Sequence, residues 1–464
     1  MPEISASSRY RALAIPDVNG LVFGRALHPV KCGFGLEIGA GSVFPEVNFT
    51  LPPIGISAET WPEILGQYEE MATNIIRRAV SLKVPGLVLE FELLPAMTER
   101  PEWGAEIAAL LHRHLAAAHD KYGLPSALRV TPTDIRDQGK PPQLRKGEHF
   151  ERLLRSFELS IAAGADILSI ESVGGKEVHD RGLMLGDLRA IVFALGVLCP
   201  ADMHWLWSRI VPLCVQSGHT VPGGDSACGF ANTAMQLAHQ KMLPEVLAAV
   251  VRAMSAVRSL AAFEEGARGP SKDCAYEGPI LKAITGVPIS MEGKSASCAH
   301  FSPIGNIASC MCDLWSNESV QNVRLLSGNA PEAFTETLIY DCRLMNVASA
   351  RGAALTMRDW LSASDEWLSP QAAVLSPEAT MAIAQAIVSE EDDYARTVAA
   401  GQAAVAILRE GAAHRGLVLS KKEIQWLDRI ESALASLPAS AGELQASLSE
   451  EYKSLYLPVS YGLK

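Results

Sequence analysis

The chain has 464 residues, of which 48% are hydrophobic and 20% are charged, and its formal net charge is −12. This composition excludes a disordered or fibrous protein and is sufficient for one large domain with additional elements. The negative charge argues against binding to nucleic acid or to an anionic membrane, since both carry phosphate groups that it repels. Nine cysteines, an odd number without framework spacing, predict free thiols.

The N-terminal residues and the apolar runs predict a location in the cytoplasm. The longest uncharged apolar run extends from Ala190 to Cys199, far short of the ~20 residues that cross a bilayer. We therefore expect no transmembrane helix. The N-terminus lacks the charged start, apolar middle and small-residue cleavage site of a secretory signal.

Between Pro85 and Cys274, runs with helical periodicity alternate with short aliphatic runs. The clearest unit is a helix from about Leu153 to Gly164, which is followed by the strand-like run Ile167-Leu-Ser-Ile170. Glu171 would then lie at the carboxyl end of that strand. Repeated units of this kind indicate a parallel sheet, and a barrel is the arrangement we favour.

Two more runs have the same form. One covers residues 86–89 and ends in Glu90, and the other covers residues 127–130 and ends near Thr131 and Asp134. In a (β/α)₈ barrel the active site is built at such strand ends. Polar residues at these positions are therefore candidates for chemistry.

The C-terminal part of the chain predicts helices only. A serine followed by proline starts one helix at Ser376, and capping boxes start others at Ser420 and Ser440. We expect residues 1–358 to form a TIM-barrel catalytic domain with an N-terminal extension. Residues 359–464 would form a helical region packed on the barrel.

Three motifs that suggest ligand binding fail in detail. The sequence Glu292-Gly-Lys-Ser has Pro288 in place of the first glycine of a phosphate loop. The glycines between Gly33 and Gly39 have the wrong spacing for a dinucleotide fingerprint and predict a tight turn. The run from Asp202 to Trp207 begins like a cobalt-binding D-x-H-x-x-G loop but lacks its glycine. The chain should therefore not carry its own corrinoid.

Cys228 and Cys274 lie in polar, glycine-containing segments that would be loops after strands. By pattern alone a cysteine is more often a small buried apolar residue than a metal ligand. Neither has a C-x-x-C partner, which argues against structural zinc. The pairs Cys298/His300 and Cys310/Cys312 are competing candidates for a metal site.

The sequence contains the blocks Leu36-Glu-Ile-Gly-Ala-Gly41, Pro45-Glu-Val-Asn48, Ile170-Glu-Ser-Val-Gly-Gly-Lys-Glu-Val178, Ala231-Asn-Thr-Ala-Met235, Lys272-Asp-Cys274, Lys282-Ala-Ile-Thr-Gly286, Met291-Glu-Gly-Lys294 through Cys298-Ala-His300, and Cys312-Asp-Leu-Trp-Ser-Asn-Glu-Ser319. Together these blocks resemble one known family, the zinc-containing catalytic subunit of methanol:corrinoid methyltransferases. The similarity extends from about Lys31 to Asn346.

The resemblance implies a (β/α)₈ barrel with one catalytic zinc held by Glu171, Cys228 and Cys274. It implies transfer of the methyl group of methanol to the cob(I)alamin of a separate corrinoid protein, with zinc activating the methanol oxygen as leaving group. It also implies a stable complex with that corrinoid protein, and we expect a homodimer within the complex.

The departing oxygen needs a proton, and carboxylates at expected strand ends could supply it. Glu37, Glu90 and Glu92 are the candidates, with pKa values that burial could raise. Asp225 and Asp273 could orient the cysteines next to them. Two alternatives remain, namely another methyl donor such as a methoxylated aromatic compound, and a non-catalytic scaffold for a corrinoid protein.

Overall fold

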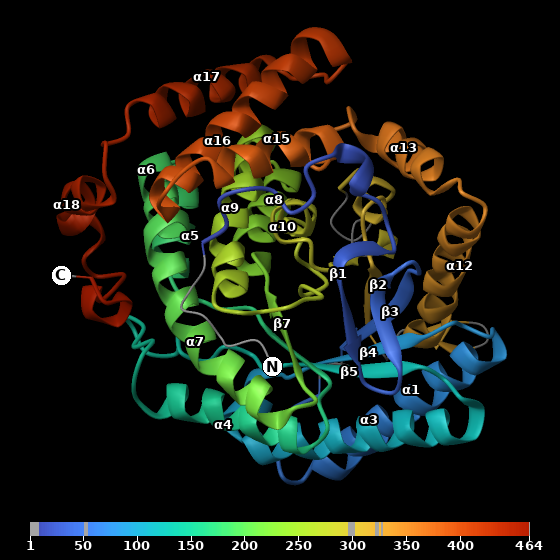
Figure 1. Cartoon of the computed structure of the whole chain (residues 1–464). Coiled ribbons are helices and arrows are strands. Elements are labelled where there is room, and N and C mark those ends of the chain that lie inside the picture. The colour runs from blue at the N-terminus through green and yellow to red at the C-terminus, as the bar shows by residue number, and fades with distance from the viewer. Residues whose placement is uncertain (1–8, 51–53, 296–301, 321–323, 326–327, 464) are drawn as a thin grey trace.

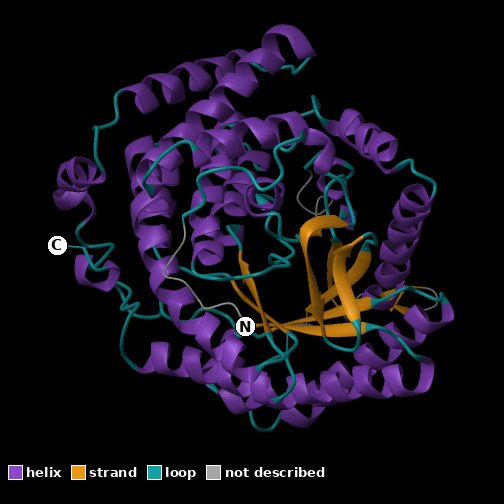
Figure 2. Cartoon of the chain, viewed as in Figure 1, coloured by secondary structure: helices purple, strands orange, loops and turns teal. Residues whose placement is uncertain are grey.

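The computed structural model describes residues 9–50, 54–295, 302–320, 324–325 and 328–463 (Figure 1). Cys298 and His300, one of the two competing ligand pairs, lie outside the described residues. A ring of helices surrounds a curled central sheet, and further helices cover one side of that ring (Figures 1 and 2).

Within the described residues, seven parallel strands form the central sheet in the order β7-β6-β5-β4-β3-β9-β8. They are β3 (Phe44–Thr50), β4 (Leu87–Glu92), β5 (Ser126–Thr131), β6 (Ile167–Ile170), β7 (Val221–Asp225), β8 (Ser290–Glu292) and β9 (Leu314–Val320). Neighbouring strands from β3 to β7 are consecutive in the chain, as in a series of repeated βαβ units.

An irregular segment, residues 268–273, occupies the place of an eighth strand between β7 and β8. The Arg268 amide donates to the Pro222 carbonyl of β7 at 2.7 Å. On the other side, a Cβ at Gly269 would lie 2.6 Å from the Pro288 oxygen just before β8. Pro270 has no N–H to extend a strand ladder, and its carbonyl instead accepts from Arg129 Nη1 at 3.0 Å. The expected (β/α)₈ barrel is thus present with one position that is not a regular strand.

The helices around the barrel follow the strands in chain order. They are α1 (Trp61–Ser81), α2 (Pro95–Glu99), α3 (Pro101–Tyr122), α4 (Glu148–Ala162), α5 (Lys176–Leu185), α6 (Leu188–Phe193), α7 (Cys199–Ser217), α8 (Thr233–His239), α9 (Glu245–Glu264), α10 (Gly278–Thr285) and α12 (Ala330–Ala350). The C-terminal helices are α13 (Ala354–Asp365), α14 (Pro370–Ala373), α15 (Pro377–Val388), α16 (Asp393–Glu410), α17 (Lys421–Ala435) and α18 (Ala441–Tyr452).

Alternation along the strands separates the helix-facing core from the barrel interior. In β4, Leu87, Leu89 and Phe91 belong to the large core under the helices, whereas Val88 belongs to a small apolar cluster inside the barrel. Glu90 is buried one step further along the same inward face. The interior therefore changes from apolar at the amino ends of the strands to charged at the carboxyl ends.

An antiparallel hairpin of β1 (Arg25–Cys32) and β2 (Leu36–Ala40) closes the amino end of the barrel. Its apolar side chains share the interior cluster with the first residues of the barrel strands. At its turn, the Phe34 amide donates to the Ser126 carbonyl of β5 at 2.7 Å. Gly33 has a φ of +51°, and a Cβ there would lie 2.2 Å from the same oxygen, so the turn requires glycine. This explains the glycines around residue 33 without a nucleotide.

Helix α9 is buried along its whole length because the barrel lies on one side and α16 packs on the other. Two stretches, Leu188–Ser217 and α9, are long and apolar enough to cross a membrane, but 78% and 100% of their apolar windows are buried inside the protein. A core helix of a folded domain meets the same criteria of length and composition, so the expectation of no transmembrane helix stays a prediction. The apolar character of α9 follows from its burial on all sides. The boundary predicted at residues 358/359 falls inside α13 and stays a prediction.

Candidate metal centre

Three side chains meet at the carboxyl end of the barrel from three different connections. Glu171 follows β6, Cys228 begins the short π-helix Cys228–Asn232 after β7, and Cys274 follows the irregular segment 268–273. Their Oε and Sγ atoms all lie within 4.8 Å of one another. Cys274 Sγ is 2.7 Å from Glu171 Oε1. The three residues are separated widely in sequence and converge because parallel strands end at one edge.

Neighbouring polar groups contact both thiols. Ser226 Oγ lies 3.2 Å from Cys274 Sγ, and the Asn232 amide nitrogen lies 3.6 Å from Cys228 Sγ. Asn232 also donates to the Cys274 carbonyl at 3.1 Å. The sulfurs are therefore held in a polar environment, unlike cysteines that serve only as apolar filling.

Asp225 and Asp273 fix the backbone beside the three residues. Asp225 Oδ1 accepts from the Ser172 and Ser226 amides at 3.2 and 2.8 Å. Asp273 Oδ1 accepts from the Cys274 amide at 2.8 Å. Their hydrogen bonds to the loops are consistent with the orienting role predicted for both, although they act on main chain and not on the sulfurs.

The pKa values of both thiols are shifted by burial and by their neighbours. A hydrogen bond from Cys274 lowers the pKa of Cys228, yet burial and the negative charge of Glu171 raise it overall to about 11. Burial, together with Cys228 and Glu171, raises the pKa of Cys274 well above its ordinary value. A divalent cation would reverse this balance by favouring both thiolates. Two sulfurs and one carboxylate oxygen match the ligand preference of zinc and leave one position of a tetrahedral ion open.

A buried lysine links this centre to the predicted proton donors. Lys272 Nζ lies 3.1 Å from Glu90 Oε1 and 3.7 Å from Oε1 of both Glu92 and Glu171, and it pairs with Asp273. Burial and the charge of Asp273 raise the pKa of Glu90 well above its usual range, although Lys272 opposes the shift. Burial also raises the pKa of Glu92, opposed by Lys272 and reinforced by Glu171. The single ammonium group of Lys272 is therefore close to the carboxylates of Glu90, Glu92, Glu171 and Asp273.

The structure does not bring Glu37, the third predicted proton donor, to this site. Glu37 lies on β2 at the amino end of the barrel, where its half-exposed side chain is 3.9 Å from Lys31. The competing pair Cys310 and Cys312 is buried in the apolar core, and burial raises the pKa of Cys310 to about 12. Neither thiol has a ligand-like partner among the groups that could hold a metal in the described part of the chain.

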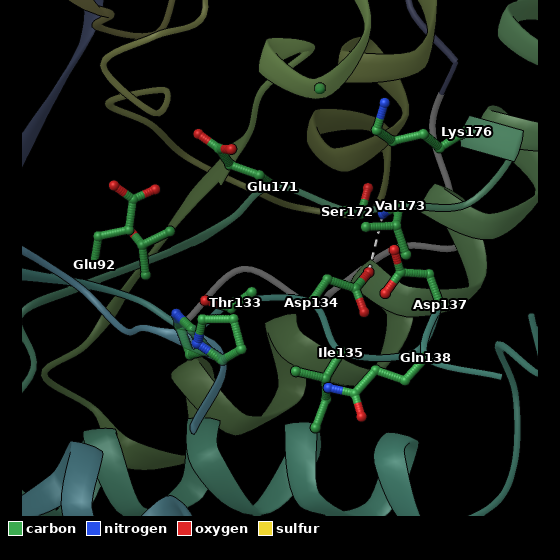
Figure 3. A pocket seen from close by; sticks show the side chains of 14 residues that line it. Glu92, Thr133, Asp134, Ile135, Asp137, Gln138, Glu171, Ser172, Val173 and Lys176 are labelled. Carbon is green, nitrogen blue, oxygen red and sulfur yellow. Dashed lines mark hydrogen bonds between the residues drawn. The ribbon is translucent and has the colours of Figure 1, made fainter. Parts of the chain in front are cut away.

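A cavity of about 450 Å³ opens beside the centre (Figure 3). Glu92 and Glu171 lie on one side of it, and Asp137 and Gln138 lie on the other. Asp134 accepts from the Val173 amide at 3.0 Å, which joins the β5 and β6 connections under the cavity. Charged side chains such as Asp137 and Lys176 and apolar ones such as Pro95 and Ile135 both line the cavity.

Sequence reasoning missed two charged residues that hold this end together. Lys272 was visible only as a neighbour of Cys274, because residues 268–273 lack the alternation of a strand. Arg258 lies in the buried helix α9 and donates to Ser172 Oγ at 2.6 Å and to Asp225 Oδ1 at 3.1 Å. Two arginines, Arg252 and Arg258, within a mainly apolar helix were the available signal, since buried charges require partners.

Comparison with known proteins agrees with this geometry over almost the whole chain. The family of methanol-cobalamin methyltransferase B subunits matches residues 7–462. A methanol–corrinoid protein co-methyltransferase of Methanosarcina barkeri is 38% identical over 465 residues, which cover 98% of this chain and 100% of the relative. The crystal structure of the methanol:cobalamin methyltransferase complex from Methanosarcina barkeri contains a chain with a TM-score of 0.94 and 36% identity, over 98% of this chain and 100% of that one. The chain therefore belongs to the methanol-cobalamin methyltransferase B subunit family.

Proposed function

We propose that this protein is a zinc-dependent methyltransferase that moves the methyl group of methanol to the cob(I)alamin of a separate corrinoid protein. The observation that carries the proposal is the convergence of Glu171, Cys228 and Cys274 beside a cavity at the carboxyl end of the barrel. The names of the relative and of the similar complex support the methyl donor and acceptor.

Glu171 and the two cysteines would hold the zinc ion. When bound, zinc supplies a Lewis acid that stabilises negative charge developing on the oxygen that leaves the methyl group. The loops carrying these residues are fixed by Asp225 and Arg258, so the ligands are placed before the substrate enters.

Glu92 is the best placed of the predicted proton donors. It lines the cavity, whereas Glu90 lies behind it and is fully buried. Because burial and Glu171 raise its pKa, Glu92 keeps its proton to a higher pH than an exposed glutamate. We propose that Glu92 protonates the departing oxygen and that Lys272 holds Glu90 and Glu92 in position.

The corrinoid belongs to a partner in this proposal, and the surroundings of His204 support that view. His204 Nδ1 lies 2.7 Å from Glu265 Oε1, in an ionic cluster that also includes Asp393. Trp207, which stands where a cobalt-binding loop has glycine, is buried and donates to Asp225 at 3.3 Å. The similar structure is a complex. The homodimer and the cytoplasmic location stay predictions.

Metal analysis combined with a methyl-transfer assay tests the proposal. Zinc would be measured in the purified wild type and in Cys228→Ala, Cys274→Ala and, as a control, Cys214→Ala, which removes a buried thiol of α7. We expect about one zinc per chain in the wild type and the control, and loss of both zinc and methylation of added cob(I)alamin in the other two. Full zinc occupancy in both site variants would refute the metal centre.

The same assay decides the methyl donor. Methanol and a methoxylated benzene would be supplied separately to wild-type protein with cob(I)alamin. We expect methylcobalamin from methanol. Methylcobalamin formed only from the methoxylated compound would show that this compound, and not methanol, is the donor. If neither compound gives methylcobalamin although zinc is bound, the result would support the scaffold hypothesis.

A further inference from the structure

The segment after α18 reaches back to the loop that carries Glu171. Gly175 donates its amide proton to Tyr461 Oη at 2.9 Å, a contact between residues 286 positions apart. Tyr461 ends the short helix η6 (Pro458–Tyr461) and is only 4% exposed. In Figure 1 the red C-terminal segment lies against the green helix α7, which η6 contacts.

Aromatic packing fixes Tyr461 in this place. Its ring is 6.2 Å from that of Tyr456, which in turn meets the Phe193 ring of α6 edge-on at 5.5 Å. Burial and the charge of Asp202 raise the pKa of Tyr461, so its hydroxyl stays neutral. The hydrogen bond to Gly175 is therefore made by a rigid group shielded from water, where such a bond is stronger than at the surface.

The loop of residues 171–176, the ligand loop, is tightly packed at Gly174 and Gly175. A Cβ at Gly174 would lie 2.3 Å from Asp202 Oδ2. Gly175 has a φ of +84°, and a Cβ there would lie 2.8 Å from Cys199 Sγ. The ligand loop is thus pressed against α7, and its position depends on whatever holds its backbone there.

Three amides of the ligand loop are held by three different parts of the chain. Asp225 at the end of β7 binds the Ser172 amide at 3.2 Å, and Asp134 after β5 binds the Val173 amide at 3.0 Å. The third amide, that of Gly175, is bound by Tyr461. Two acceptors come from the barrel and the third comes from the C-terminal segment.

We propose that Tyr461 is a positioning residue for the metal centre, because its hydroxyl holds the ligand loop that carries Glu171. The proposal rests on the proposed function for the identity of the metal. In this proposal the C-terminal segment helps to position the metal centre and also packs on the barrel. The carboxylate would then depend on a residue near the other end of the chain.

The test compares Tyr461→Phe with Tyr452→Phe in the full-length protein. Tyr452 is 1% exposed, and its hydroxyl donates to Asp187 Oδ2 at 3.2 Å, so the control removes one buried hydroxyl from the same part of the chain. Both substitutions keep the aromatic ring. Hydrogen exchange of peptides containing residues 172–178 reports on the loop, and zinc release to a colorimetric chelator reports on the metal centre.

We expect Tyr461→Phe to release zinc roughly fivefold faster and to raise amide exchange at Gly175 by a similar factor, the size expected for one lost hydrogen bond. Tyr452→Phe should match the wild type in both. Unchanged zinc release in Tyr461→Phe, or equal acceleration in both variants, would overturn the positioning role. A wild type that binds no zinc would instead overturn the proposed function, and this is seen before the variants are compared.

Discussion

Two buried lysines at opposite ends of the barrel have contrasting surroundings. At the amino end, Lys282 of α10 contacts both Oδ atoms of Asp313 at 2.9 Å and donates to the Val22 and Met311 carbonyls at 3.0 and 2.8 Å. At the carboxyl end, Lys272 faces the carboxylates of Glu90, Glu92, Glu171 and Asp273. One lysine has a single carboxylate partner and the other has four.

The difference separates a structural cluster from a functional one. Asp313 also accepts from the Ile289 amide at 2.8 Å, so the amino-end pair is neutral and fully bonded. At the carboxyl end, Glu90 Oε2 has no hydrogen-bond partner among the described residues. Uncompensated buried charge is costly unless it takes up protons or a cation. The excess of carboxylates therefore favours both a protonated glutamate and a bound metal.

Removing the amino-end ammonium should give the largest effect, and it should act on stability. Lys282→Met leaves Asp313 buried without its partner, which costs about 3–5 kcal/mol of unfolding free energy. Denaturant unfolding would measure the loss against Lys31→Met, a control at a lysine whose side chain is 80% exposed. The folded fraction should keep its zinc and its methyl-transfer rate. A variant as stable as the wild type would contradict the structural role.

Removing a proton donor at the carboxyl end should act on rate instead. Glu92→Gln keeps the size and neutral charge of a protonated glutamate but cannot deliver a proton, so methylation of cob(I)alamin should slow about a hundredfold. Since the pKa of Glu92 is raised, the wild-type rate should stay high at low pH and fall as pH rises through that pKa. The fall should be absent in the variant.

A matched variant separates this role from a general charge effect. Glu102→Gln changes an exposed glutamate of α3 and should leave the rate and its pH dependence unchanged. A wild-type pH profile retained in Glu92→Gln would assign the proton to another group.

A third ionic cluster is balanced only while a histidine is charged. It joins the N-terminal segment, α7, α9 and α16 and contains Arg9, His204, Arg396, Glu264, Glu265 and Asp393. Burial lowers the pKa of His204, but hydrogen bonds with Asp393 and Glu265 raise it overall to about 9. Three cations then meet three carboxylates.

Stability should therefore fall on the alkaline side. The folded pKa of His204 lies above the unfolded value of about 6.5, so its contribution is complete below about pH 6.5 and is lost as pH rises through about 9. The gap between a pKa of about 6.5 and one of about 9 corresponds to a loss of about 3 kcal/mol over this range. Thermal melting of the wild type and of His204→Gln across this range would measure it. Parallel curves for the two proteins would show that another group titrates.

The sequence predicted the strand ends well because their pattern is local. The helix before β6 and the aliphatic run of β6 placed Glu171 at a carboxyl end. The same reasoning placed Glu90 directly after a strand, although β4 continues to Glu92. Local pattern could not identify Cys228 and Cys274 as partners of Glu171, because only the folded barrel brings the three together. The family resemblance supplied that step.

Contacts across the fold left little local signal in the sequence. Lys272 lies in the one barrel position without a regular strand, and Tyr461 meets Gly175 across 286 positions. Arg258 was hidden in a helix whose apolar composition reflects burial on every side. Charge neutralisation and loop positioning depend on tertiary distances, which residue spacing does not contain.

The sequence did not show at which end of the barrel Glu37 lies. A substitution of Glu37 gives the smallest expected effect. Glu37 belongs to an antiparallel hairpin under the amino end of the barrel and not to a barrel strand. Its side chain is 46% exposed beside Lys31, and such surface pairs contribute about 0–1 kcal/mol. Glu37→Gln should therefore leave zinc content and methyl-transfer rate at wild-type values, and change unfolding free energy by less than about 1 kcal/mol. A rate loss comparable to that of Glu92→Gln would mean that the amino end takes part in the chemistry, and the division between the two ends would fail.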